Sequence, residues 1–250
     1  AGKITDGFGR RFHYLRLSVT EVCNFSCTYC LPNGWKKTGP LSFLTVDEIG
    51  RLVAGFSDLG LSKVRLTGGE PTVRKDFNAI IQTVASAPGV AKVAMTTNGW
   101  NLARHATDWR ASGLSHINVS IDSIDPEKHD SFRGGPKSWE YSVRALEICR
   151  AHGLEVLVQT TVMETNSSEI PQLLDFAREK GAWSFNLYFL VQTGRGQEMN
   201  DLSPQRTEAM LTNLAEMQSK YRPMLVRSKC APHFKRIAFE RALGGLESGG

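Results

Sequence analysis

The alternation of strand-like and helix-like segments constrains the fold of this chain more than any other feature. Six apolar runs rich in β-branched residues have the length of buried strands: His13–Val19, Lys63–Thr67, Lys92–Thr97, His116–Ile121, Glu155–Val162 and Ser184–Leu190. Amphipathic stretches of helical period lie between them: Thr45–Leu59, Phe77–Ser86, Leu102–Ser112, Ser138–His152 and Ser168–Lys180. This order predicts an α/β fold, a partial (β/α)6 barrel of the TIM type, with its site at the carboxyl ends of the strands.

The pattern changes after Leu190. A Gly-rich loop precedes a helix that begins at Ser203-Pro204 and runs to about Tyr221, and a second helix is expected over Phe234–Leu243. We therefore predict a barrel core over residues 1–196. Residues 197–250 are predicted to form a helical extension that leads to a missing or disordered region.

Composition limits the possible partners. The net charge of +5 is mild and no basic stripe stands out, so we expect an anionic small-molecule substrate and no nucleic acid. No run approaches the about 18 apolar residues that cross a membrane, and the polar opening predicts no signal peptide. We expect a cytoplasmic protein without a membrane partner, whose five cysteines are not paired in disulfides.

Three cysteines, Cys23, Cys27 and Cys30, follow the first predicted strand. Thiolates this close in sequence can converge on one metal centre, and soft sulfur ligands select iron–sulfur clusters or zinc. Three protein ligands would leave one iron of a four-iron cluster open. The alternative is a structural zinc site whose fourth ligand is distant, such as a histidine or Cys230.

Polar residues also follow the next strands. Thr67-Gly-Gly-Glu-Pro71 ends the second strand, where two glycines let the backbone approach a ligand and Glu70 can accept a bond from an ammonium group. Thr96-Thr97-Asn98-Gly99 ends the third strand, and Ser120 and Asp122 lie at the end of the fourth. We expect all of these groups to meet at the mouth of the barrel.

The spacing Cys-x-x-x-Cys-x-x-Cys with Tyr29 before the last cysteine, followed by Gly-Gly-Glu-Pro, resembles the radical S-adenosylmethionine (SAM) superfamily. The resemblance implies an enzyme in which Cys23, Cys27 and Cys30 hold a [4Fe–4S] cluster whose open iron chelates SAM. A reduced ferredoxin or flavodoxin-type donor would supply the electron that splits SAM into methionine and a 5′-deoxyadenosyl radical. The implied SAM contacts are Tyr29, Gly68, Gly69, Glu70, Thr97, Asn98, Ser120, Asp122 and Val191.

From Ile4 to Asp125 the chain resembles the GTP 3′,8-cyclases of molybdenum-cofactor synthesis, in segments such as Phe8-Gly-Arg-Arg-Phe12 and Lys63-Val-Arg-Leu-Thr67. This resemblance places Arg16, Arg65 and Thr96 where those enzymes hold GTP. Two features depart from it. The cyclases have a lysine on the fifth strand that binds the substrate triphosphate, and the stretch Val156–Thr160 has none, so a lysine introduced at Val158 would test for GTP binding. Cys230 is the only cysteine in the region where the cyclases bind a second cluster.

The C-terminal part resembles radical SAM enzymes of haem d1 and alternative haem synthesis, in Asn186–Gly196, Asp201–Pro204 and Lys229–Phe234. It implies Cys230 as a candidate ligand of a second, auxiliary [4Fe–4S] cluster, and Arg195 and Arg227 as clamps for substrate carboxylates. On this basis we rank a tetrapyrrole substrate first, with GTP as the alternative and a peptide third. A non-enzymatic zinc protein is the competing class.

Overall fold

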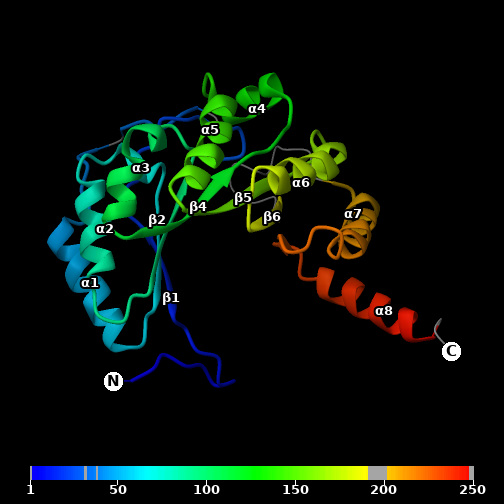
Figure 1. Ribbon diagram of the computed structural model, residues 1–250, viewed down its shortest axis with the longest axis horizontal. Helices are drawn as coiled ribbons and strands as arrows, with labels where there is room; N and C mark the ends of the chain where they lie inside the picture. The colour runs from blue at the N-terminus through cyan, green and yellow to red at the C-terminus, as the bar shows by residue number, and fades with distance from the viewer. Residues whose placement is uncertain (1, 31–32, 38, 191–201, 248–250) are drawn as a thin grey trace.

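The sheet is the organising element of the molecule. The computed structural model describes residues 2–30, 33–37, 39–190 and 202–247, with side chains as far as residue 241. Seven parallel strands lie side by side in chain order: β1 (Tyr14–Ser18), β2 (Lys63–Thr67), β3 (Lys92–Thr97), β4 (Leu114–Ser120), β5 (Glu155–Val162), β6 (Ser184–Phe189) and β7 (Leu225–Lys229). The sheet is curved into a half-barrel (Figure 1), which confirms the predicted α/β class of partial barrel.

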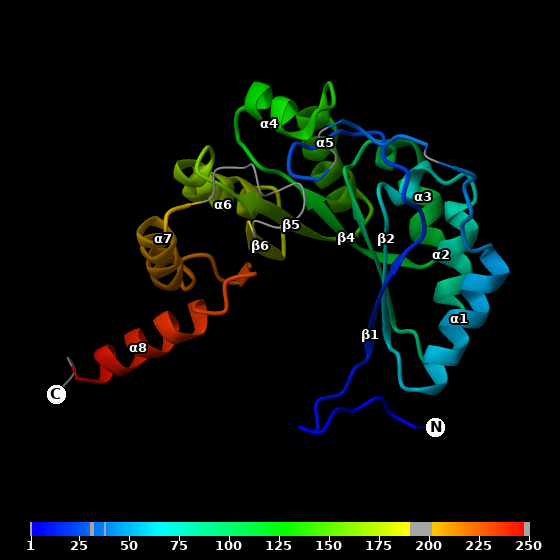
Figure 2. The ribbon, with the colours of Figure 1, turned by 180° about the vertical axis from the view of Figure 1, so that it is seen from behind.

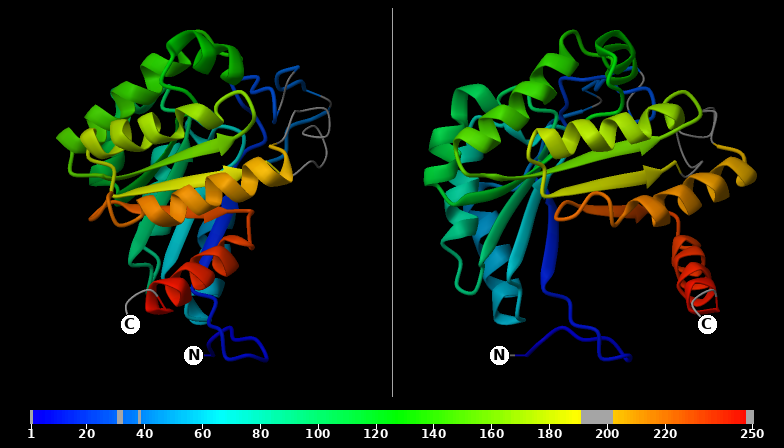
Figure 3. Two further views of the ribbon diagram at one scale, coloured as in Figure 1. Left: turned by 90° about the vertical axis from the view of Figure 1, so that its right-hand side faces the viewer. Right: turned by 45° about the vertical axis from the view of Figure 1, so that its right-hand side comes forward.

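Helices connect successive strands and pack on the convex side of the sheet (Figures 2 and 3). They are α1 (Val46–Asp58), α2 (Phe77–Ala85), α3 (Leu102–Ala111), α4 (Pro126–Arg133), α5 (Ser138–Ala151) and α6 (Ile170–Glu179), with short 3-10 turns η1 (Pro71–Val73) and η2 (Ser167–Glu169). Beyond β6 come α7 (Pro204–Met217) and α8 (Phe234–Glu247), which contact each other. Within the described residues, no helix is both long and apolar enough to pass through a lipid bilayer.

Two elements differ from the prediction. The expected six strands missed β7, which pairs with β6 from Ser184↔Leu225 to Tyr188↔Lys229 although its sequence lies in the predicted helical extension. As an edge strand it buries Val226 and keeps charged neighbours, so it has no apolar run. Helix α4 was also missed, because its buried residues are the polar His129 and Arg133. The domain boundary at residue 196 stays a prediction.

The two faces of the sheet have different chemistry. Along each strand, apolar side chains enter the core under the helices, such as Val156 and Val158 on β5. The alternate positions face the concave side, which we call the lumen. Most of them are polar: Tyr14, Arg16, Lys63, Arg65, Lys92, Thr96, His116, Asn118, Ser120, Glu155, Gln159, Asn186, Tyr188, Arg227 and Lys229.

The alternation shows that position 158 on β5 is the wrong place to introduce a lysine that should reach the lumen. Val158 is 1% exposed and belongs to the core, so a lysine there would enter the helical layer rather than the lumen. The neighbouring lumen-facing positions on β5 are Leu157 and Gln159.

Candidate functional site

A cavity of about 400 Å³ lies at the carboxyl ends of the strands. It brings together most of the side chains that the sequence singles out, from segments far apart in the chain. Those that line it are Arg16, Cys23, Cys27, Tyr29, Cys30, Gly68, Gly69, Glu70, Thr96, Thr97, Asn98, Ser120 and Cys230. Asp122 and Arg65 lie outside its wall, and the predicted Val191 and Arg195 lie outside the described residues.

The two glycines of the Gly-Gly-Glu turn hold the cysteine loop in place. Gly69 N–H donates to Thr20 O at 2.8 Å, and Glu70 N–H donates to Val22 O at 2.8 Å. A Cβ at Gly68 would lie 2.3 Å from Thr20 O, and one at Gly69 would lie 2.3 Å from Val22 O. The close approach that requires glycine here is therefore to the loop leading into Cys23, not to a ligand alone.

Glu70 lines the cavity as predicted for a SAM contact, and the structure adds bonds to the protein itself. Its buried carboxylate accepts bonds from Thr72 N–H, Thr72 Oγ1, Thr97 Oγ1 and Asn98 N–H at 2.6–3.1 Å. Burial raises the pKa of Glu70, and these four donors oppose that rise. The carboxylate thus fixes the Thr97-Asn98 turn to β2, so that it shapes the cavity wall by orienting other residues.

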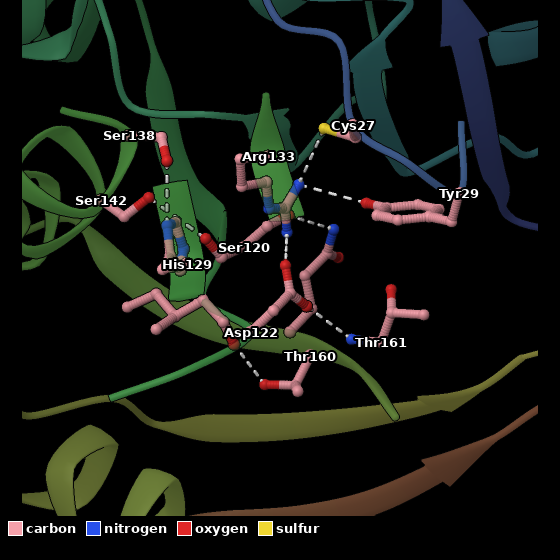
Figure 4. A network of polar contacts seen from close by, with 12 residues as sticks. Cys27, Tyr29, Ser120, Asp122, His129, Arg133, Ser138, Ser142, Thr160 and Thr161 are labelled. Carbon is pink, nitrogen blue, oxygen red and sulfur yellow. Dashed lines mark hydrogen bonds and ion pairs between the residues drawn. The ribbon is translucent and has the colours of Figure 1, made fainter. Parts of the chain in front are cut away.

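Arg133 was not predicted, yet it lies beside the cysteine loop (Figure 4). Its Nη2 lies 2.5 Å from Asp122 Oδ2, and its Nη1 donates to Tyr29 Oη at 3.1 Å and approaches Cys27 Sγ at 3.7 Å. Burial by itself would lower the pKa of the Arg133 guanidinium. Asp122, Tyr29 and Cys27 together raise that pKa by more than burial lowers it, so the guanidinium stays charged. Its Nε is buried without a partner.

A second polar group supports this arrangement. Asp122 Oδ1 accepts from Thr161 N–H at 2.7 Å, and Gln159 Nε2 donates to Ser120 Oγ at 2.9 Å.

The sequence contains a signal for the buried polar residues of α4. His129 and Arg133 are four residues apart on an otherwise exposed helix, so they share its buried face. Burial lowers the pKa of His129 to about 4, so it is neutral at pH 7.

The cysteines differ in their surroundings. Cys27 is buried, Cys23 is half-buried and Cys30 is exposed, and burial raises the pKa of Cys23 to about 11. Among the described residues no three His, Cys, Asp or Glu side chains converge as they would on a single metal ion. All three cysteines nevertheless line one cavity, as the ligands of a shared metal–thiolate centre must.

The two remaining cysteines have separate environments. Cys149 is buried within α5, where burial raises its pKa to about 12, which fits a core residue. Cys230 follows β7 with a φ of 60° and lines the same cavity as the cysteine loop. The sheet therefore brings Cys230 to the site across some 200 residues of sequence.

The predicted substrate residues divide between two levels of the half-barrel. Arg16 and Thr96 line the cavity. Arg65 lies on the lumen face of β2 with its guanidinium 5.7 Å from the Tyr14 ring centroid, and its Nε is buried without a partner.

A parallel half-barrel that gathers thiols above a Gly-Gly-Glu turn is a scaffold for a metal–thiolate centre at the strand ends. The sequence model of the Radical SAM superfamily matches residues 17–177. The chain belongs to this superfamily, a class of enzymes that use a [4Fe–4S] cluster and SAM.

Curated relatives narrow the comparison. The chain is 50% identical to the GTP 3′,8-cyclase of Tolumonas auensis over 193 residues, which is 76% of this chain and 57% of that protein. It is 47% identical to the GTP 3′,8-cyclase of Stenotrophomonas maltophilia over 194 residues, covering 77% and 59% of the two. The matched part thus spans less than two thirds of these relatives' length.

Solved structures share the fold. Streptococcus suis SuiB bound to S-adenosylmethionine superposes with a TM-score of 0.73 at 14% identity, covering 87% of this chain and 50% of that one. The enzyme anSMEcpe with bound AdoMet gives a TM-score of 0.66 at 15% identity, covering 86% and 62%. At this level of identity the likeness concerns the fold alone.

Proposed function

We propose that this chain carries the radical-generating half-barrel of a GTP 3′,8-cyclase, with GTP as its substrate. The identity of 46–50% to enzymes of that name, over about four fifths of the chain, is the observation that carries the proposal. The ranking from the sequence, which put a tetrapyrrole first, is reversed, because the relatives favour GTP and no relative named here supports haem synthesis.

Cys23, Cys27 and Cys30 are the proposed ligands of the [4Fe–4S] cluster. All three line the cavity, and within the described part of the chain none of them is in a disulfide. When bound, the cluster and SAM together supply a radical that abstracts hydrogen from the substrate.

The side chains around the cavity have distinct proposed tasks toward SAM. Arg133 lines the cavity, approaches Cys27 through its Nη1 and has an unpartnered Nε, and it supplies a cation for the SAM carboxylate. Tyr29 stacks on Phe132 at 5.2 Å between ring centroids and closes the wall beside Arg133. Asn98, tied to Asn24 by a 2.9 Å bond, and Ser120 supply neutral polar atoms for the ribose.

The substrate is proposed to lie on the lumen side of this site. Arg16, Thr96 and Gln159 line the cavity from β1, β3 and β5. Side chains on three different strands can orient a substrate relative to SAM, and orientation is the main contribution that a protein makes to such a reaction.

Anaerobic reconstitution with iron and sulfide, followed by SAM, dithionite and GTP, tests the proposal. We expect about four irons per chain and formation of 5′-deoxyadenosine that increases with GTP. Cys27→Ala should lose the iron, whereas the matched control Cys149→Ala should keep it, since Cys149 is buried within α5. Stimulation by a carboxylated tetrapyrrole instead of GTP would contradict the proposal.

The cysteine count limits a second cluster. Outside the cysteine loop the chain has only Cys149 and Cys230. Because Cys149 is enclosed by the core, this chain offers one thiol, Cys230, to an auxiliary cluster, whose other ligands would have to come from elsewhere. Iron content near four in both the parent chain and Cys230→Ser would agree with this limit.

A further inference from the structure

A separate cavity of about 220 Å³ lies between helices α3 and α5, outside the half-barrel. The two helices contact each other on the convex side of the sheet (Figure 1). The lining comes from the first turn of α3, the loop before it and one face of α5. It shares no described residue with the cavity that the cysteines line, so the two cavities are distinct.

Two arginines, one from each helix, line this cavity. Arg104 lies in the first turn of α3 and Arg144 lies on α5, and both side chains are exposed. Among the described residues, neither guanidinium has a carboxylate oxygen within 4 Å or a hydrogen-bonded partner. This includes Asp108, which lies one turn after Arg104 on α3. The cavity wall thus carries two positive charges that no neighbouring side chain neutralises.

The acidic residues of α5 pair with other cations. The two glutamates within one turn of Arg144 form their ion pairs with lysines, Glu140 with Lys137 at 3.9 Å and Glu147 with Lys180 at 3.0 Å. Helical spacing would allow either glutamate to pair with Arg144. The guanidinium groups at the cavity therefore stay available to an external anion.

The rest of the lining is aromatic and apolar. Trp100 is 40% exposed although its indole is a large apolar surface, and it lines the cavity from the α3 side. Tyr141 and Ile148 line it from α5. Ligand sites commonly combine apolar walls with a few charged groups that fix orientation. These walls suit a planar ring attached to the anionic group.

The charge pattern favours phosphate over carboxylate. A phosphate monoester presents three acceptor oxygens and carries about two negative charges at neutral pH. Guanidinium forks from two directions can bind such a group at once, whereas one fork already satisfies a carboxylate. The first turn of α3 adds to this preference, because Asn101 at its N-cap makes no side-chain cap bond and a helix amino end favours anions.

We propose that the cavity between α3 and α5 binds a small phosphate monoester, with Arg104 and Arg144 on the phosphate and Trp100 against its organic part. The site goes beyond the proposed cyclase function and does not depend on it. It lies directly behind the cavity that the cysteines line, because Trp100 N–H donates to Asn98 Oδ1 at 3.0 Å and Asn98 lines that cavity.

Calorimetric binding of phenyl phosphate to the reconstituted chain tests the proposal, with benzoate as the carboxylate of similar shape. We expect Arg104→Gln and Arg144→Gln each to weaken phenyl phosphate binding by about tenfold. Two controls should bind it like the parent. Arg150→Gln changes an exposed arginine of α5 that does not line the cavity, and Arg227→Gln changes a cation of the lumen.

Tryptophan fluorescence locates the ring of the ligand. Phenyl phosphate should change the emission of the parent, and Trp100→Phe should remove that change. A parent chain that does not bind phenyl phosphate overturns the proposal, as does parent-like binding in Arg104→Gln or Arg144→Gln. A loss in Arg227→Gln would place the ligand in the lumen, and an equal loss in Arg150→Gln would show a general charge effect, so either result also overturns it. Benzoate binding as tight as that of phenyl phosphate would overturn the assignment to phosphate monoesters.

Discussion

At the scale of single residues, the pair Arg133–Asp122 is the strongest electrostatic contact beside the site. Both side chains are nearly inaccessible, at 7% and 1% exposure. Arg133→Gln should lower the free energy of unfolding by about 3–5 kcal/mol, because it leaves the Asp122 carboxylate buried without its cation. It should also weaken SAM binding. Urea denaturation and SAM titration measure the two effects.

The double variant Arg133→Gln, Asp122→Asn separates these roles. Removing both charges should restore much of the stability, since no buried charge is left unpaired. SAM binding should remain weak, because the cation is still missing. A double variant as unstable as the single one would contradict the ion-pair explanation, and restored SAM binding would contradict the role of Arg133 toward SAM.

Gly69→Ala tests how the cysteine loop is held. The new Cβ would lie 2.3 Å from Val22 O and 2.6 Å from Glu21 O, so the loop must move away from β2. We expect the Gly69→Ala variant to have the same circular dichroism spectrum as the parent, but to bind less than half as much iron after reconstitution. Gly55→Ala is the control: Gly55 is exposed in α1 with nothing within 4 Å of its Cβ position. That change should stabilise the fold by about 0.5–1 kcal/mol. Full iron incorporation in Gly69→Ala would contradict the explanation.

At the scale of elements, strand β5 offers a test of the two sheet faces. Val158→Lys should lower the free energy of unfolding by about 3 kcal/mol or more, because it buries an unpaired charge in the core. Leu157→Lys should be tolerated better, since its ammonium group can extend into the polar lumen, and should tighten tripolyphosphate binding. Thermal unfolding and binding measurements give both results, with Leu157→Met as the volume-matched control. Equal destabilisation at both positions would show that the faces are misassigned.

The elements also show what sequence alone could predict. The six predicted strands agree with β1–β6 to within two residues at either end, because apolar core-facing residues recur at every second position of each strand. At the start of α1, Thr45 and Glu48 form a capping box with both of its bonds present, a pattern that the residues Thr45-Val-Asp-Glu48 show in the sequence. Strand β7 was missed because an edge strand needs only Val226 buried. The tertiary partners of Glu70 and Arg133 could not be predicted either, because their contacts join segments that the sheet, not the sequence, makes neighbours.

At the scale of the whole molecule, the excess positive charge is concentrated where the proposed substrate binds. The chain carries a net charge of +5, and its lumen contributes several unpaired cations that solvent can reach, Arg16, Lys92 and Arg227 among them. Salt screens exposed charges over roughly 10 Å at 0.1 M ionic strength. GTP binding should therefore weaken by about tenfold between roughly 50 and 300 mM salt.

SAM supplies the internal comparison for this prediction. Its methionyl part carries charges of both signs, and its proposed cation Arg133 is buried against Asp122, where screening is weaker. The dissociation constant of SAM should thus change much less than that of GTP over the same salt range, when both are measured by calorimetry on the reconstituted protein. Arg227→Gln should flatten the salt dependence of GTP without altering that of SAM. If the two ligands weakened in parallel, the positive lumen would not be the source of nucleotide affinity, and the charge would serve the molecule in another way.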